Sequence, residues 1–164
     1  MIRVRINTSI YPTEDPGRVM AALKKMFVFS DAQVQQERKT EVVSLKIDVS
    51  IRYEVEVTRV VIETNDRLCL EKLQGLFRDE YIQECARSVL YSSRTRVEGN
   101  ATKVSFKLHK QAAYIGVVHF SELHESPLGP INVDIITDDF EEFVNWFAPR
   151  ETMAKGTKPD ACKD

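Results

Sequence analysis

The sequence predicts a single α+β domain with a curved, mainly antiparallel sheet and helices packed on one face. Its 164 residues suit one domain with a proper core, and 43% apolar and 29% charged content are ordinary for a globular protein. Some segments alternate apolar and polar residues with the period of a strand, and others repeat apolar residues at helical spacing. The two kinds of segment mix without strict strand–helix alternation, which favours an antiparallel sheet.

A strand and a capped helix are predicted at the start of the chain. Residues 2–7 alternate apolar and polar side chains, which indicates a half-buried strand with Arg3 and Arg5 on its exposed face. Thr13 or Asp15 can cap the helix that follows, and Pro16 suits its first turn because no N–H is needed there. The side chains at helical spacing on its inward face are Val19, Leu23, Met26 and Phe27.

The strongest periodic signal runs from Leu45 to Val57, where apolar residues occupy every odd position. This stretch predicts either one long strand or a hairpin. The absence of Asn-Gly or proline inside it favours one long strand, bent or bulged, which Val60 to Ile62 extends. A strand of this length could offer a free edge to a second copy of the chain, so a homodimer is one prediction for its partners.

Two apolar stripes at helical spacing follow, over residues 70–77 and 81–90. Asn65 or Asp66 can cap the first, and Gly75 and Asp79 indicate a break between two helical parts. Arg87 lies within the second stripe, and we expect it to tie this helix to a neighbouring loop.

The last part of the chain predicts strands and short helices in turn. Strands are expected over residues 103–108, 117–120 and 131–135, with a helical turn over residues 112–115. Asp138 or Asp139 caps a closing helix. After Arg150 the composition turns to Lys, Thr, Gly, Pro and Asp, so we expect one domain over residues 1–150 and a disordered tail over residues 151–164.

Sites for catalysis, metals or membranes are not indicated. No apolar run approaches the ~20 residues of a membrane span, and the absence of a signal-peptide pattern predicts the cytoplasm. The string from His119 to Glu125 lacks the HExxH spacing of a zinc helix, and a strand–loop would not place its histidines on one face. We therefore predict no catalytic residue, no metal site, no cofactor and no enzyme activity. The rigid loop from Ser126 to Ile131, beside Lys110 and Gln111, could line a ligand site.

Charge is unevenly distributed along a chain whose formal net charge is −2. From Arg87 to Lys110 there are six basic residues against one acid, Glu98, whereas residues 111–149 contain no Lys or Arg. Any affinity for nucleic acid must therefore come from a local patch.

A basic surface is predicted around the strand at residues 103–108. Lys103 and Lys107 share one face of it, and a hairpin through Gly99 and Asn100 would bring Arg94 and Arg96 to the same surface. The predicted contacts to a structured RNA backbone are Arg94, Arg96, Lys103, Lys107, Lys110 and Gln111. No aromatic pair shares this face, so base stacking is not predicted there. The alternative is a solvated strand face whose lysines only prevent aggregation.

Four stretches in this order resemble an archaeal group, uncharacterised protein family 0201. They are Pro12–Pro16, Ala86–Leu90, Lys110–Ala113 and Ser126–Ile131. Asp138–Asp139 and Trp146–Arg150 complete the resemblance, which spans roughly residues 2–150. The resemblance implies a fold similar to the large-subunit ribosomal protein that binds 5S RNA. It also implies RNA binding as the expected function, with no catalytic residues.

Overall fold

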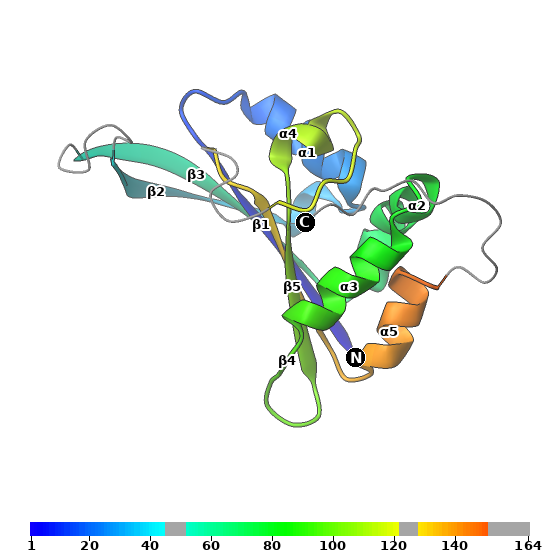
Figure 1. Ribbon diagram of the computed structural model, residues 1–164. Coiled ribbons are helices and arrows are strands. Elements are labelled where there is room, and N and C mark those ends of the chain that lie inside the picture. The colour runs from blue at the N-terminus through cyan, green and yellow to red at the C-terminus, as the bar shows by residue number, and fades with distance from the viewer. Residues whose placement is uncertain (45–51, 122–127, 151–164) are drawn as a thin grey trace.

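Six strands form one open antiparallel sheet in the computed structural model, which describes residues 1–44, 52–121 and 128–150 (Figure 1). The strand order is β2-β3-β1-β6-β5-β4, so the strand nearest the start of the chain lies inside the sheet. The strands are β1 (Ile2–Ile10), β2 (Val34–Ser44), β3 (Arg52–Thr64), β4 (Thr95–Arg96), β5 (Thr102–Leu108) and β6 (Ile131–Thr137). The α+β class and the antiparallel sheet are as predicted.

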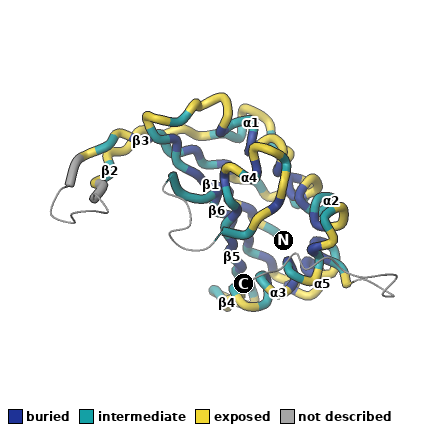
Figure 2. Tube along the Cα trace, turned by 45° about the horizontal axis from the view of Figure 1, so that its top comes forward, coloured by how far each residue is buried: buried dark blue, intermediate teal, exposed yellow. Residues whose placement is uncertain are grey.

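Helices cover one face of this sheet and enclose one hydrophobic core (Figures 1 and 2). The α-helices are α1 (Pro16–Met26), α2 (Glu71–Asp79), α3 (Gln83–Ser93), α4 (Lys110–Tyr114) and α5 (Phe140–Phe147). Every second residue of β1, β5 and β6 points into the core: Val4, Ile6, Thr8, Ile10, Val104, Phe106, Leu108, Ile131, Val133, Ile135 and Thr137. The residues between them face away from the helices.

The helix boundaries follow from capping groups that the sequence already displays. Asp15 accepts a hydrogen bond from the Gly17 amide (2.9 Å) at the start of α1, and Asp139 accepts one from the Glu142 amide (3.1 Å) at the start of α5. Each cap satisfies an amide that has no partner inside its helix. The predicted break between two helices is confirmed: α2 and α3 are separate, and Tyr81 between them has a positive φ of 57°.

The described part of the long alternating stretch, from Arg52 onward, forms a hairpin with β2, so the single strand that we favoured from the sequence is wrong. Ser44 pairs with Arg52, and β2 and β3 run antiparallel from there. Residues 45–51 lie outside the described part of the chain. β1 pairs with β3 only as far as Thr58, opposite Ile10. Beyond that pair β2 and β3 continue alone, and this two-stranded extension, residues 39–44 and 52–57, is called the arm (Figure 1).

Two other segments differ from expectation. Strand β2 was not predicted, because residues 35–41 are all polar and an exposed edge strand needs no alternation. The strand predicted over residues 117–120 is reduced to one isolated bridge between Leu108 and Phe120. Residues 122–127 and the expected disordered tail, residues 151–164, lie outside the described residues.

Candidate nucleic-acid interface

The side of the sheet without helices, here called the open face, carries polar side chains in ordered rows. The register aligns Lys103 of β5 with Ile136 of β6 and Arg3 of β1. The next row aligns Ser105, Asp134 and Arg5 and continues to Glu63 of β3. A third row aligns Lys107, Asn132 and Asn7. Bases on β1 and β5 are two strands apart, or about 10 Å at ordinary strand spacing.

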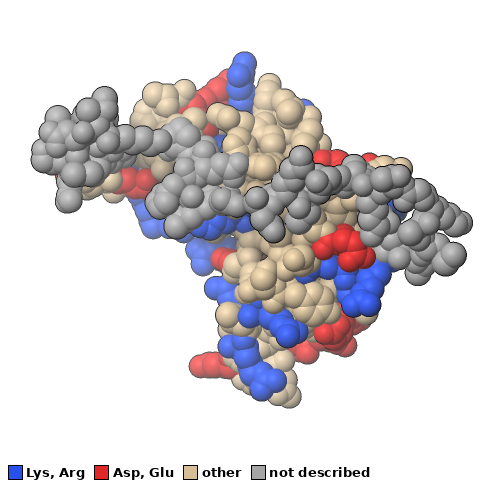
Figure 3. All heavy atoms as spheres, in the orientation of Figure 1, with Lys and Arg blue, Asp and Glu red and all other residues tan. Residues whose placement is uncertain are grey.

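Basic residues outnumber acidic ones on the open-face positions of β1, β3, β5 and β6. The bases are Arg3, Arg5, Arg59, Lys103 and Lys107, and the acids are Glu63 and Asp134. Arg5 pairs with Glu63 at 3.5 Å, and Asp134 accepts a hydrogen bond from Ser105 at 2.6 Å. Among the described residues, the other four bases form no ion pair within 4.0 Å. In Figure 3, Lys and Arg side chains gather from beneath the arm down to the β4–β5 hairpin, with acidic side chains between them.

A shallow hollow of about 280 Å³ lies within the open face. Its lining includes Arg59, Lys107, Asn7, Asn132 and Asp134, from four adjacent strands. The Asn132 amide donates a hydrogen bond to the Asn7 side-chain oxygen at 3.2 Å, which orients both amides. The hollow thus combines two cations with amides, which can donate to and accept from hydroxyls, and a carboxylate, which can accept from them.

The β4–β5 hairpin does not bring Arg94 and Arg96 onto the open face with Lys103 and Lys107. Thr95 is the residue that pairs with Lys103, while Arg96 pairs with Thr102. Since directly paired residues share a face, Arg96 projects toward the helix side. The Arg94 guanidinium lies 5.2 Å from the Tyr91 ring centre and 5.6 Å from that of Phe140, at the end of α3. Both arginines are exposed, but they flank the edge of the sheet.

Lys110 is not on the predicted surface either, because its side chain is only 5% exposed. Its Nζ donates hydrogen bonds to Glu14 Oε1 (3.0 Å), the Ser9 carbonyl (2.6 Å) and the Leu128 carbonyl (2.8 Å), which uses all three of its protons. Burial lowers the pKa of Lys110, and the hydrogen bond and negative charge of Glu14 oppose that shift. Gln111, the next residue, is exposed.

Arg59, Asn7 and Asn132 are residues of the open face that sequence reasoning did not select. Arg59 directly precedes an apolar run, Val60 to Ile62, and the face of β3 on which it lies became evident only from the pairing of β3 with β1. The two asparagines carry no charge and lie in different strands, so only the register joins them. The one available signal was the alternation of β1, which places Asn7 on the same face as Arg3 and Arg5.

The His109 side chain caps the start of α4. His109 Nδ1 accepts from the Ala112 amide (3.2 Å) at the start of α4, and the His109 and His119 rings lie 5.5 Å apart. Within residues 1–44, 52–121 and 128–150, no three His, Cys, Asp or Glu side chains are grouped to hold a metal ion. In the same residues, no helix has the length and apolarity needed to cross a membrane.

Comparisons with known proteins give the family. Residues 3–137 match a family model described as RNA binding. The UPF0201 protein of Pyrobaculum calidifontis is 37% identical over 156 residues, 94% of each chain, and that of Methanopyrus kandleri is 35% identical over 93% of this chain and 88% of its own. The crystal structure of the UPF0201 protein from Methanococcus jannaschii is 28% identical, with a TM-score of 0.63 over 92% of this chain and 95% of that one. The chain therefore belongs to the archaeal UPF0201 family.

Proposed function

We propose that this protein binds structured RNA through the open face of its sheet. The observation that carries the proposal is the in-register placement of Arg3, Arg59, Lys103 and Lys107 on a helix-free face, without ion pairs among the described residues. The match of residues 3–137 to an RNA-binding family model supports the same class of partner.

Phosphate contacts supply most of the affinity in such a complex, and lysine and arginine side chains provide them. An RNA helix also displays 2′-hydroxyls across a wide, shallow minor groove. The amides of Asn7 and Asn132, held in the hollow between Arg59 and Lys107, can both donate to and accept from such hydroxyls. The open face therefore suits recognition by shape and backbone. Arg94 and Arg96 would extend the contact around the short edge strand β4.

Charge reversal on the open face tests the proposal. The double variant Lys103→Glu/Lys107→Glu should bind a structured RNA at least tenfold more weakly than the unaltered protein, because two phosphate contacts become repulsive. The neutral pair Lys103→Gln/Lys107→Gln should show a smaller loss. Filter binding at low salt measures both.

A matched control reverses two charges on the helix side, Lys24→Glu and Arg78→Glu, whose side chains are 58% and 74% exposed. It changes the net charge equally and should leave RNA binding within about twofold. Equal losses in the control and the open-face variant would mean that overall charge, rather than the open face, governs binding. No binding by the unaltered protein at low salt would refute the proposal.

A second candidate function is homodimer formation through the arm. β2 is an edge strand of eleven residues, and Val42 near its end is 61% exposed. An isolated two-stranded ribbon is marginally stable in water, so a partner strand along β2 would stabilise the arm. A second copy could supply that strand and continue the sheet across the pair.

Light scattering over a range of protein concentrations tests the dimer. We expect twice the chain mass in the unaltered protein and the single-chain mass after Val42→Lys, which places a charge in the contact. Lys24→Glu on α1 is the control and should leave the mass unchanged. A single-chain mass for the unaltered protein at high concentration would exclude this candidate.

A further inference from the structure

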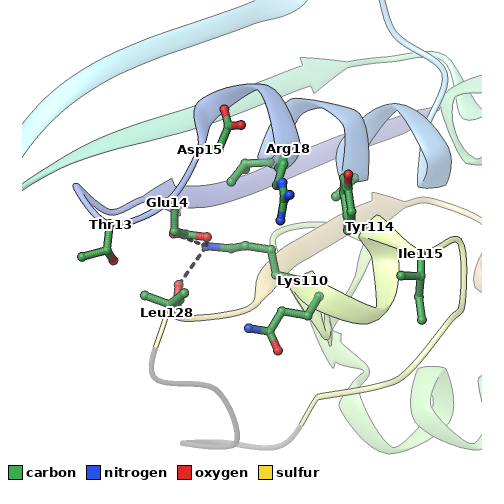
Figure 4. A pocket seen from close by; sticks show the side chains of 11 residues that line it. Thr13, Glu14, Asp15, Arg18, Lys110, Tyr114, Ile115 and Leu128 are labelled. Carbon is green, nitrogen blue, oxygen red and sulfur yellow. Dashed lines mark hydrogen bonds and ion pairs between the residues drawn. The ribbon is translucent and has the colours of Figure 1, made fainter.

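A pocket of about 680 Å³ lies between α1, α4 and the loop that precedes α1, away from the open face (Figure 4). That volume falls within the roughly 300–1,000 Å³ of small-molecule sites. Lys110 and Glu14 form part of its lining, and both side chains are less than one-tenth exposed. Three of the stretches that carry the family resemblance meet here, since Lys110 Nζ binds both Glu14 and the Leu128 carbonyl.

The Lys110–Glu14 pair shapes the pocket without supplying free charge. Each proton of Lys110 has an acceptor, and Glu14 also accepts from the Tyr11 amide (3.1 Å). The two charges cancel, so a ligand must be recognised by the side chains around the pair. The buried pair keeps the loop, the end of β1 and the start of α4 in fixed relative positions.

The exposed polar side chains around the pocket differ in their chemistry. Arg18 points from α1 into the space beside Lys110, whereas the neighbouring Asp15 points away from it (Figure 4). Asp15 is engaged as the cap of α1. Among the described residues Arg18 makes no ion pair, and its guanidinium lies 5.5 Å from the Tyr114 ring centre. Gln111 adds an amide that can donate and accept.

The wall beside Arg18 is mainly apolar. Tyr114 is 37% exposed and Ile115 is 69% exposed, although both are large side chains. Val19 and Ala22 of α1 complete that wall. Lys25 lies 5.3 Å from the Tyr114 ring centre and donates to the Tyr114 carbonyl (2.6 Å), so the ring is held in place from α1.

We propose that this pocket binds one nucleoside monophosphate unit, either a free nucleotide or an unstacked residue of an RNA strand. The base would lie against Tyr114 and Ile115, its edge would reach Gln111, and the phosphate would meet Arg18. Stacking on a tyrosine ring accepts any base, and guanidinium groups match phosphate oxygens. This inference deepens the proposed RNA-binding function where the unit belongs to RNA, and stands apart from it where the nucleotide is free.

The pocket lies on the helix side of the sheet, near the end of β5 that carries Lys107 on the open face. Lys107 of the open face precedes Lys110 by three positions in the chain. Ser9, whose carbonyl accepts from Lys110 Nζ, neighbours Arg59 in the register of β1 and β3. An RNA strand that leaves the open face past Lys107 would reach the pocket by passing around this end of the sheet.

Titration with uridine monophosphate and with adenosine monophosphate tests the pocket directly. Amide chemical shifts in residues 18–22 and 111–115 should change, and calorimetry should show saturable binding. Arg18→Ala and Tyr114→Ala should each weaken binding about tenfold, while Tyr114→Phe keeps the ring and should stay near the unaltered protein. Arg78→Ala removes an exposed arginine on α2 and should have no effect. No shift at these amides, or equal binding by Arg18→Ala, would overturn the proposal for free nucleotides.

A second experiment, with RNA duplexes, distinguishes a free nucleotide from an RNA residue as the ligand, and the pocket from the open face. If the unit comes from RNA, a duplex with a single-stranded overhang should bind more tightly than the blunt duplex, and Arg18→Ala/Tyr114→Ala should remove only that advantage. Lys103→Glu/Lys107→Glu should weaken both duplexes. Mononucleotide binding without an overhang effect supports the pocket as a free-nucleotide site. If mononucleotides do not bind and the overhang gives no advantage, the proposed nucleotide pocket is overturned. Binding of the blunt duplex would then still support the open face as an RNA-binding surface.

Discussion

The buried ion pair of Lys110 and Glu14 joins four segments of the chain at one nitrogen atom. Ion pairs of this kind are costly to desolvate, and removal of one partner leaves an uncompensated charge inside the protein. Burial already lowers the pKa of Lys110 despite the presence of Glu14. The pair is therefore a place where a single substitution should have a large effect on stability.

At this residue scale we predict that Glu14→Gln lowers the free energy of unfolding by about 3 kcal/mol, because it leaves the Lys110 charge buried without its counter-charge. The double variant Glu14→Gln/Lys110→Met should recover a large part of that loss, since no buried charge remains. Urea unfolding of both single variants and the double variant gives the coupling energy. Additive losses in the double variant would show that the two side chains act independently.

The sequence predicted the contacts of some side chains and missed those of others, and the difference has a physical reason. Arg87 was expected to tie its helix to a loop, and it donates hydrogen bonds to Asn145 (3.2 Å) and to the Ala148 carbonyl (3.0 Å). Its apolar neighbours along one helix were sufficient evidence for burial. Lys110 had no such local signal, because its partners Glu14 and Ser9 lie 96 and 101 positions away.

At the scale of elements, the arm has little support from the rest of the sheet. Its β3 half pairs with β2 alone, whereas β3 from Thr58 to Ile62 pairs with both β1 and β2. Among its described side chains, Val42 and Glu54 are exposed. Segments with few buried contacts open at low free energy.

We expect backbone amides at the outer end of β3, residues 54–56, to exchange with deuterium much faster than those of residues 60–62. The reason is that opening the arm exposes little apolar surface, whereas residues 60–62 exchange only with disruption of the core. Hydrogen exchange measured by mass spectrometry or NMR at low protein concentration distinguishes the two segments. Equal protection would mean that the arm is stabilised, and protection that increases with protein concentration would indicate a partner strand.

Several elements with local signals were predicted correctly, although the alternation over residues 117–120 gave only one bridge, and strand β2, which depends on its neighbour, was not predicted. The caps Asp15 and Asp139 and the alternation of β5 and β6 are local features, and these elements formed where expected. The polar strand β2 has a strand's conformation because β3 pairs with it over eleven positions. Such pairing depends on tertiary context, which overrides local propensity.

At the scale of the whole molecule, the sign of the net charge does not describe the charge on each face. The formal net charge is −2, yet four bases of the open face lack ion pairs among the described residues. The sequence located Lys103 and Lys107 on one face, but not the order of strands that brings Arg3 and Arg59 beside them. That order places β6 between β1 and β5, and it depends on contacts between distant parts of the chain. The expected likeness to the ribosomal 5S-RNA-binding protein stays a prediction.

RNA affinity should therefore fall steeply with salt even though the protein is acidic overall. With about four phosphate contacts, raising the salt from about 50 to 200 mM should weaken binding by about 50- to 150-fold through counterion release. Binding isotherms across that range give the slope of log affinity against log salt. Each open-face base that is neutralised should reduce the slope by about one. A slope near zero would mean that phosphates contribute little to the complex.

The position of β1 has a consequence for how the chain reaches its fold. This strand lies inside the sheet, and its partner β6 follows so late that Asn7 bonds to a residue 125 positions further along. While the chain is made on the ribosome, one edge of β1 must wait for nearly all later elements before it is paired. Loops of that length close slowly, and topologies rich in distant contacts fold slowly. Until β6 is made, the unpaired edge of β1 can associate with other chains. We therefore expect chaperones to reduce aggregation of the nascent chain most before β6 is synthesised.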